Sequence, residues 1–220
     1  MQKIYGALAC MLLSVCALGQ TLQSTTPDYT RPAAIGVQFF LNDYESAANI
    51  RSGSLGSVFL DKKFGKIKEM SPGLAIVYIK GISNHLDYTV TASGSFVDYP
   101  LQNRPASGSD KFLLEIDASV VGKMFTDRYW VIPTISLGAG FSKYGVYYGA
   151  YLPAGVGLQL NFFDEAYLVI NSQYRIPVTE TANYHFYHSI GIMGSMFKKN
   201  NNGDATGKRK ALPGLPITAR

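Results

Sequence analysis

Residues 86–98 read LDYTVTASGSFVD, and this stretch decides the fold. Its even-numbered positions are Leu86, Tyr88, Val90, Ala92, Gly94 and Phe96. Its odd-numbered positions begin with Asp87, Thr89, Thr91, Ser93 and Ser95. Because successive side chains of a β-strand point to opposite faces, this period of two predicts one long strand with an apolar face and a polar face.

The same alternation recurs between residues 33 and 197. It is clear in residues 112–123, 131–143, 154–162 and 168–176, and weaker in residues 35–42, 74–82 and 185–197. In residues 74–82 both faces are mostly apolar, so only Lys80 and Gly81 indicate which face is which. Together with residues 86–98, these segments make eight predicted strands and an all-β chain.

The predicted connections alternate between long and short. Short turns are predicted near residues 83–84, 126–128 and 164–166, and longer connections at 45–70, 100–110, 145–151 and 179–184. Short turns on one side and long loops on the other are typical of outer-membrane barrels, and strands of about nine to eleven residues cross a bilayer when tilted. The sequence therefore predicts an eight-stranded antiparallel up-and-down transmembrane β-barrel.

Composition favours the membrane barrel over a soluble lipocalin-like barrel, in which the apolar face points inward to a ligand cavity. Charged residues make up 16% of the chain, against roughly 25% in soluble domains. The polar face carries Gly, Ser, Thr and Asn instead of the many Lys and Glu that a water-exposed wall needs. Aromatic residues at strand ends are typical of the two membrane interfaces. The predicted interface aromatics are Tyr99, Tyr129, Trp130, Tyr144, Phe162, Phe163 and Tyr167.

The N-terminal residues predict a secretory signal peptide. Lys3 precedes an apolar run, and small residues at Ala17 and Gly19 predict cleavage after about Gly19. Both cysteines lie in this segment, and lipidation of Cys16 is a weaker alternative because Val15 is large for the preceding position. The predicted organisation is a signal peptide at 1–19, an N-terminal periplasmic segment at 20–32, the outer-membrane β-barrel at 33–197 and a basic disordered periplasmic tail at 198–220.

The net charge of +5 does not indicate a nucleic-acid partner. The tail contains six Lys and Arg against Asp204, and the signal segment contains Lys3. The remaining body has 13 basic and 14 acidic residues, so it lacks the basic surface that nucleic acid requires.

Six charged residues are predicted to point into the barrel. They are Lys80, Asp87, Glu115, Asp117, Lys123 and Arg175. The interior of an eight-stranded barrel is just wide enough for side chains, and an unpaired buried charge is costly. These two facts favour a salt-bridged plug over a channel or an enzyme site.

His185 and His188 form the pattern H-x-x-H, which on a helix suggests a metal site. On a strand, an offset of three puts the two rings on opposite faces, so they cannot share one ion. A hydrolase would need Ser, His and Asp side chains that converge, and His185 with Ser189 is too common a combination to indicate one. The sequence predicts no catalytic residue, no metal, no cofactor and no enzyme.

Several motifs resemble the barrel part of OmpA-like outer-membrane proteins of the Bacteroidota. They are MSPGLA (70–75), YIKG (78–81), GSFVDYP (94–100), MFTDRYW (124–130), GVGLQ (155–159) and NSQYR (171–175). The resemblance covers about residues 33–197 and carries no chemistry. Many such proteins continue into a peptidoglycan-binding domain, whereas here a basic tail follows the barrel motifs, so no wall-anchoring role is carried over.

These observations predict a structural protein of a Gram-negative outer membrane, with a filled polar lumen and outward loops that serve envelope integrity or surface interaction. A narrow pore for small solutes or ions and a soluble ligand-binding barrel are the alternatives. The expected partners are outer-membrane lipid and the barrel assembly machinery, with no specific protein partner. Lipopolysaccharide is an open alternative for the loop residues Lys62, Lys63, Lys66 and Lys68, which otherwise form a solvated face.

Overall fold

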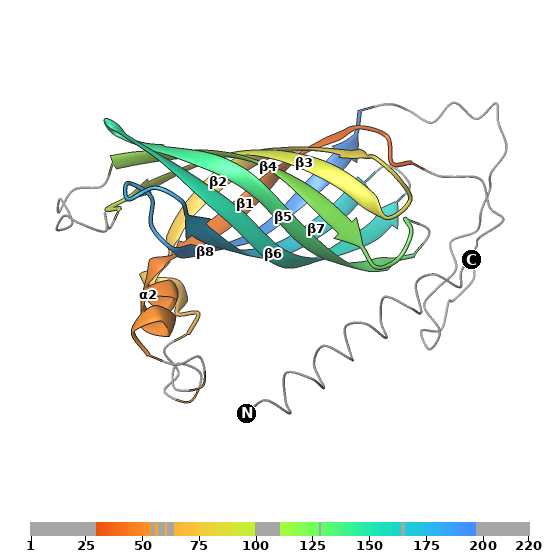
Figure 1. Ribbon diagram of the computed structural model, residues 1–220. Coiled ribbons are helices and arrows are strands. Elements are labelled where there is room, and N and C mark those ends of the chain that lie inside the picture. The colour runs from red at the N-terminus through yellow and green to blue at the C-terminus, as the bar shows by residue number, and fades with distance from the viewer. Residues whose placement is uncertain are drawn as a thin grey trace, which may run out of the picture.

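The computed structural model describes residues 30–53, 56, 60, 64–99, 111–127, 129–163 and 166–196. Eight antiparallel strands close into a barrel in chain order, and the first strand pairs with the last (Figure 1). This arrangement confirms the predicted up-and-down barrel. The strands are β1 (Ala34–Asp43), β2 (Ser71–Gly81), β3 (Leu86–Val97), β4 (Lys111–Lys123), β5 (Val131–Tyr144), β6 (Tyr147–Phe163), β7 (Ala166–Pro177) and β8 (His185–Ser195).

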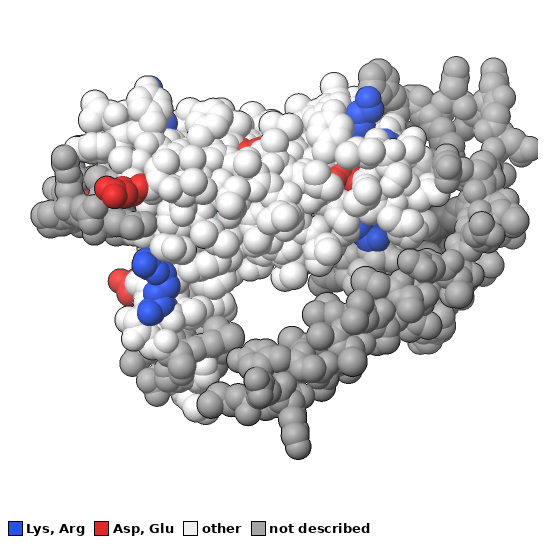
Figure 2. Space-filling model, viewed as in Figure 1, with Lys and Arg blue, Asp and Glu red and all other residues white. Residues whose placement is uncertain are grey.

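In most strands the polar face points into the barrel and the apolar face points outward. In β3, Asp87 and Ser93 are 0% and 1% exposed, whereas Val90 and Phe96 are 37% and 68% exposed. Charged groups on the visible wall lie mainly toward its two ends (Figure 2). A soluble ligand-binding barrel has the opposite polarity, so this apolar outer wall is that of a transmembrane barrel. Among the described residues, no helix is long and apolar enough to cross a membrane.

The prediction of a long loop at residues 145–151 is wrong. β5 ends at Tyr144 and β6 begins at Tyr147, so Gly145 and Val146 alone form the turn. Gly145 has a φ of 59°, which glycine adopts without steric cost and which two-residue hairpin turns require. β6 is therefore 17 residues long, and the β5–β6 hairpin extends beyond its neighbours (Figure 1).

The connection between β1 and β2 contains a helix that the sequence analysis treated as loop. α2 (Tyr44–Ser52) begins after Asp43, whose carboxylate accepts a hydrogen bond from the Ser46 N–H at 2.8 Å. A short 3-10 helix, η1 (Ile67–Glu69), precedes β2. α2 lies beside β8 at one end of the barrel (Figure 1). We call this end, which also carries the β5–β6 turn, the loop end, and the opposite end, with the turns at 82–85 and 124–130, the short-turn end.

Candidate functional site in the barrel lumen

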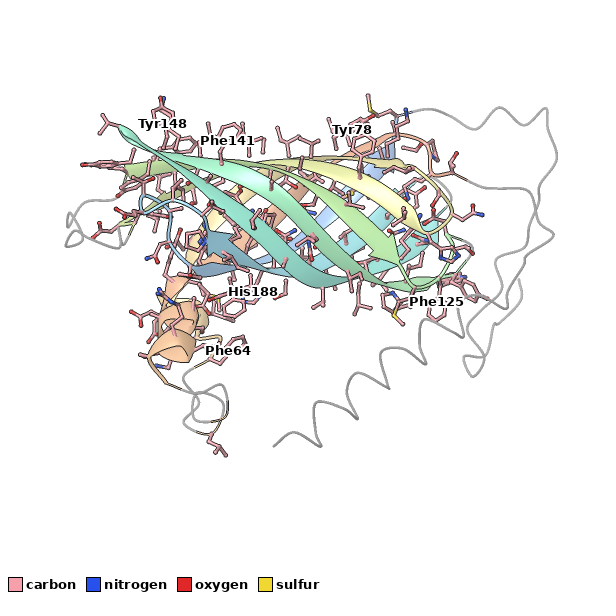
Figure 3. All side chains as sticks on the ribbon, in the orientation of Figure 1. Phe64, Tyr78, Phe125, Phe141, Tyr148 and His188 are labelled. Carbon is pink, nitrogen blue, oxygen red and sulfur yellow. The ribbon has the colours of Figure 1, made fainter. Side chains whose placement is uncertain are left out.

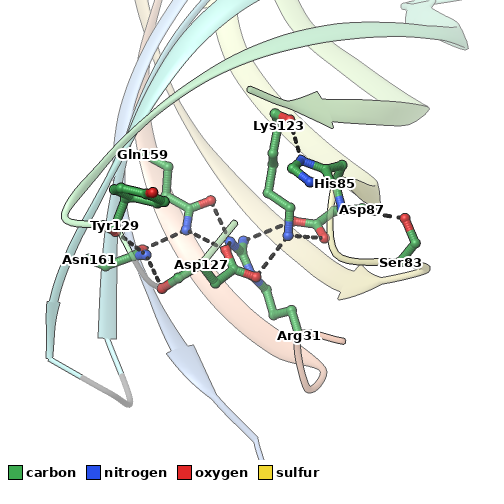
Figure 4. A network of polar contacts seen from close by, with 9 residues as sticks. All are labelled: Arg31, Ser83, His85, Asp87, Lys123, Asp127, Tyr129, Gln159 and Asn161. Carbon is green, nitrogen blue, oxygen red and sulfur yellow. Dashed lines mark hydrogen bonds and ion pairs between the residues drawn. The ribbon is translucent and has the colours of Figure 1, made fainter. Parts of the chain in front are cut away.

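The lumen contains an ion cluster at the short-turn end, formed by Arg31, Asp87, Lys123 and Asp127 (Figure 4). Lys123 Nζ lies 2.8 Å from Asp87 Oδ1 and 2.8 Å from Asp127 Oδ2. Arg31 Nη1 lies 3.2 Å from Asp87 Oδ2, and Nη2 also binds Asp127. Each base therefore contacts both carboxylates, and we call this group the short-turn cluster.

Amide side chains connect the short-turn cluster to the turn between β4 and β5. Arg31 Nη2 donates to Gln159 Oε1 at 2.6 Å, and Gln159 Nε2 donates to Asn161 Oδ1 at 2.6 Å. Asn161 Nδ2 then donates to the backbone carbonyls of Asp127 and Tyr129, at 3.1 and 3.0 Å (Figure 4). These bonds hold the turn over the barrel mouth.

Arg31 and Asp127, which both lie outside the strands, support each other's ionisation. Burial alone would raise the pKa of Asp127, but the positive charges of Arg31 and Lys123 lower it below its ordinary value. Burial likewise opposes the charge on Arg31, but Asp127 and Asp87 raise its pKa above the ordinary value. Asp127 and Arg31 are therefore both charged at neutral pH.

A second ion cluster fills the loop end of the lumen. Arg175 Nη1 binds Glu115, and Nη2 lies 3.1 Å from Asp117 Oδ1. His185 Nε2 lies 3.4 Å from Glu115 Oε1. Two tyrosine rings flank the guanidinium carbon, which lies 3.9 Å from the ring centre of Tyr187 and 4.9 Å from that of Tyr151. We call the four ionisable groups, Arg175, Glu115, Asp117 and His185, the loop-end cluster.

The space between the two clusters is small, and its walls are partly polar and partly apolar. The cavity there measures about 40 Å³, and its walls include Thr91, Ser136 and Gln173. The described side chains therefore fill most of the lumen.

The structure places five of the six predicted lumen charges in these clusters, and the sixth prediction is wrong. Asp87 and Lys123 lie in the short-turn cluster, and Glu115, Asp117 and Arg175 lie in the loop-end cluster. Lys80 is exposed on the outer face of β2, between the buried Ile79 and the half-buried Gly81. Its position near the short-turn end lets a long side chain carry its ammonium group to the polar edge of a membrane.

Three of the predicted interface aromatics lie inside the barrel instead. Tyr99, Tyr144 and Tyr167 are 3%, 5% and 3% exposed. The Tyr144 hydroxyl donates to the Val97 carbonyl at 3.1 Å and accepts from the Tyr99 N–H at 3.2 Å. The ring of Tyr167 lies 4.7 Å from the guanidinium carbon of Arg31. These rings fill the two ends of the lumen, which is why strand-end aromatics are not all lipid-facing.

The remaining interface predictions divide in two. Trp130 is 45% exposed at the short-turn end, and Tyr129 is half-buried there with its ring 5.2 Å from Phe125. The side chains of Phe162 and Phe163 lie outside the described part of the chain. Outward rings that were not predicted lie along the wall, where Figure 3 labels Tyr78, Phe141 and Tyr148.

Lumen residues that lie outside strands or carry no charge were not predicted from the sequence. Arg31 precedes β1 and Asp127 lies in a turn, so strand alternation assigns neither of them to a face. Tyr151, Tyr187 and Gln159 do lie in the inward phase of their strands, and that phase was the available signal.

His185 and His188 lie on opposite faces of β8, as predicted. His185 is 1% exposed and faces the lumen beside Glu115, whereas His188 lies on the outer wall. Within the described ranges, no group of three or more His, Cys, Asp or Glu side chains is arranged to hold a metal ion.

The fold and its lumen define a class of protein, the small eight-stranded transmembrane β-barrel with a charged interior. No family model matches the chain, and no curated protein matches it.

Among solved structures, Neisserial surface protein A is similar with 13% identity and a TM-score of 0.49, over 76% of this chain and 99% of that one. The N-terminal barrel domain of Pseudomonas aeruginosa OprF has 10% identity and a TM-score of 0.46, over 76% and 98%. Ail, the attachment invasion locus protein of Yersinia pestis, has 12% identity and a TM-score of 0.44, over 75% and 96%. At these identities and scores the comparisons assign no function.

Proposed function

We propose that this chain is a structural, non-enzymatic protein of a Gram-negative outer membrane, with a closed lumen and a loop end that faces the cell exterior. The observation that supports this proposal is the pair of ion clusters at opposite ends of the lumen. Each cluster pairs its charges internally, with side chains that are almost fully buried. Such a plug stiffens the barrel and leaves no described charge lining an open path.

The proposed location follows from the outer wall and from the N-terminal sequence. An apolar wall on a closed barrel suits a bilayer, and a signal peptide at residues 1–19 would direct export. That segment and the basic tail at 198–220 lie outside the described residues, so both remain predictions. Membrane lipid and the barrel assembly machinery are the partners that this proposal needs, and envelope integrity or surface interaction is the role it gives the loop end.

A narrow pore is the second candidate, and the cavity between the clusters is the observation that favours it. A pore would need ions to pass Arg175 and then Arg31, which would break charge pairs that are excluded from water. Breaking a buried pair is costly, because the remaining charge has no partner and little solvent. The filled barrel is therefore the better-supported function.

Conductance in planar bilayers tests the proposal. We expect the refolded protein to insert and to show no stepwise current. Arg175→Gln removes one positive charge inside the lumen, and Lys80→Gln is the matched control that removes one outside it. Stepwise currents whose ion selectivity changes with Arg175→Gln and not with Lys80→Gln would establish the pore instead.

A further inference from the structure

A polar pair interrupts the apolar outer wall near the loop end. Ser172 of β7 and His188 of β8 are cross-strand partners on the outer face, and Ser172 Oγ lies 2.9 Å from His188 Nδ1. Their neighbours in the same row across the wall are Leu41 on β1 and Val156 on β6. Polar and ionisable side chains are costly at such positions in a membrane, and where they occur they commonly mark a site of function.

An open groove lies next to this pair on the membrane-facing side. Its volume is about 490 Å³, and it is lined almost entirely by apolar surface. The next row of side chains toward the short-turn end forms its floor, and this row is Phe39, Ile190, Ile170 and Leu158. Ser172 is small in a wall of larger apolar residues, which leaves this part of the wall hollow.

Aromatic rings bound the groove toward the loop end. The ring of Phe186 is parallel to that of His188, with centres 5.7 Å apart and an interplanar angle of 6°. Phe64, in the segment after α2, lies edge-on to Phe186 at 5.4 Å and to His188 at 6.4 Å. Figure 3 shows Phe64 and His188 on the side of the barrel where α2 lies. The groove is therefore apolar toward the short-turn end and polar at the Ser172–His188 pair, and aromatic rings bound it toward the loop end.

The hydrogen-bonding capacity of His188 indicates what kind of group binds beside the Ser172–His188 pair. When the Ser172 hydroxyl donates to Nδ1, the ring proton is on Nε2, and Nε2 becomes a donor. Within the described part of the chain, no hydrogen bond to Nε2 is made. Lipid ester carbonyls accept hydrogen bonds, and they are the acceptors that a phospholipid bilayer offers to a donor on a membrane-facing wall.

The same geometry argues for binding and against hydrolysis of the ester. A serine hydrolase needs about two hydrogen-bond donors that point at the developing oxyanion. Ser172 lies inside a strand that pairs with β6 on one side and β8 on the other, so the ladder uses the backbone N–H groups around it. None of the described residues that line the groove is Lys or Arg, so these residues also offer no partners to a headgroup with several phosphates.

We propose that this groove binds one acyl chain of an ester-linked phospholipid from the surrounding bilayer, with the ester carbonyl accepting a hydrogen bond from His188 Nε2. Ser172 is a positioning residue, because its hydroxyl fixes the His188 tautomer and ring orientation. The proposal rests on the membrane location proposed above and adds a defined lipid site to it.

Quenching of a tryptophan reporter by brominated lipids tests the site. The chain has one tryptophan, so Trp130→Phe gives a dark background. Ile192→Trp places a reporter on the outer face of β8 two residues below Ile190, outside the groove lining. Leu137→Trp on β5 is the matched control, because Leu137 and Ile192 are 65% and 64% exposed. Each reporter is measured in vesicles of brominated phosphatidylcholine with either ester-linked or ether-linked chains.

We expect the Ile192→Trp reporter to show a relative binding constant about threefold higher for the ester lipid, which is the preference that one ordinary hydrogen bond supplies. The Leu137→Trp reporter should show a ratio of one, because the comparison of two lipids at one position cancels effects of depth. Adding His188→Leu should reduce the Ile192→Trp ratio to one, and Ser172→Ala, which alters only one small side chain, should reduce it in part. A shift in gel mobility on boiling verifies that each variant is a folded barrel.

Equal quenching by ester and ether lipids at Ile192→Trp would overturn the lipid site while leaving the membrane barrel intact. A preference that survives His188→Leu, or release of free fatty acid from the ester lipid, would also overturn it. Reporters that neither lipid quenches would instead contradict the membrane location, so the two failures are distinguishable.

Discussion

Both ends of the lumen contain two buried carboxylates that need basic partners, but the two ends differ in the number of bases that supply the positive charge. The short-turn cluster has two bases, Arg31 and Lys123, each of which contacts both carboxylates. The loop-end cluster has one arginine, Arg175, between two carboxylates. His185 contacts Glu115 as well, but a histidine is charged only when it is protonated. Loss of one base from the short-turn cluster therefore leaves both carboxylates with a second base. Loss of Arg175 leaves two buried carboxylates without a permanent positive charge beside them.

Charge pairs stabilise the barrel at both ends of the lumen. Because of this difference, we expect the free energy of unfolding to depend more on single residues of the loop-end cluster than on those of the short-turn cluster. Arg31 lies before β1 and Asp127 lies in the β4–β5 turn, so the short-turn cluster also fixes segments outside the strands. Every member of the loop-end cluster belongs to a strand, and the rings of Tyr151 and Tyr187 cover its arginine. The first cluster ties connections to the barrel, and the second fills it.

Arg175→Leu should have the largest effect on stability. The change leaves Glu115 and Asp117 buried near each other, and breaking a buried pair in this way costs about 3–5 kcal/mol. We expect the urea midpoint of the refolded protein, followed by tryptophan fluorescence in lipid vesicles, to fall by a corresponding amount. Arg175→Lys keeps the charge without the two-pronged contact, so it should lose less. A loss no greater than that of Lys123→Met would show that the loop end is as redundant as the short-turn end.

Lys123→Met should have a smaller effect, because Arg31 still contacts both Asp87 and Asp127. The loss expected is that of a buried hydrogen-bonded charge whose partners keep a second base, about 1–3 kcal/mol. The same urea titration measures it. The double variant with Arg31→Met removes that second base, so its loss should exceed the sum of the two single losses. Simple additivity of the two losses would show that Arg31 and Lys123 do not substitute for each other.

The alternation of polar and apolar residues was enough to predict those lumen charges that lie in strands with one polar and one apolar face. In β3 and β4 the polar and apolar faces are distinct, so Asp87, Glu115 and Asp117 could be assigned to the lumen. In β2 both faces are apolar, because the inward Val77 and Ile79 pack in a core cluster. With no polar face to compare, the one charge in that strand was assigned to the lumen, and Lys80 was misplaced.

Other features depend on contacts between segments that are distant in the sequence. Nothing near Arg31 or Asp127 indicates that they meet, since 96 residues separate them. Tyr99 and Tyr144 have the composition of interface residues, but each is buried by packing against the other, with ring centres 5.2 Å apart. The Ser172–His188 pair was also missed, because polarity on the outer wall becomes visible only when the register of β7 and β8 is known.

Acidification should affect the short-turn cluster in a defined direction. The pKa of Asp127 is lower in the folded protein than its ordinary value of about 3.9. Its contribution to stability is therefore fully present above the ordinary pKa and is lost as the pH falls through the lowered one. Unfolding in urea at a series of pH values between neutral and strongly acid measures this loss. Asp127→Asn should lower stability at neutral pH and make the acid dependence shallower, and an unchanged slope would contradict the assignment.

Lys80→Leu should have the smallest effect, and it separates charge inside the barrel from charge on its wall. Lys80 and Lys123 lie in neighbouring parts of the sheet, but Lys80 is exposed and Lys123 is 4% exposed with two carboxylate partners. Surface substitutions away from special features usually change stability by about 0.5 kcal/mol or less, and leucine suits a lipid-facing wall. The urea midpoint should therefore stay close to that of the unaltered protein. If Lys80→Leu were as damaging as Lys123→Met, the β2 register that places Lys80 outside would be wrong, because only an inward lysine would leave a buried carboxylate without its partner.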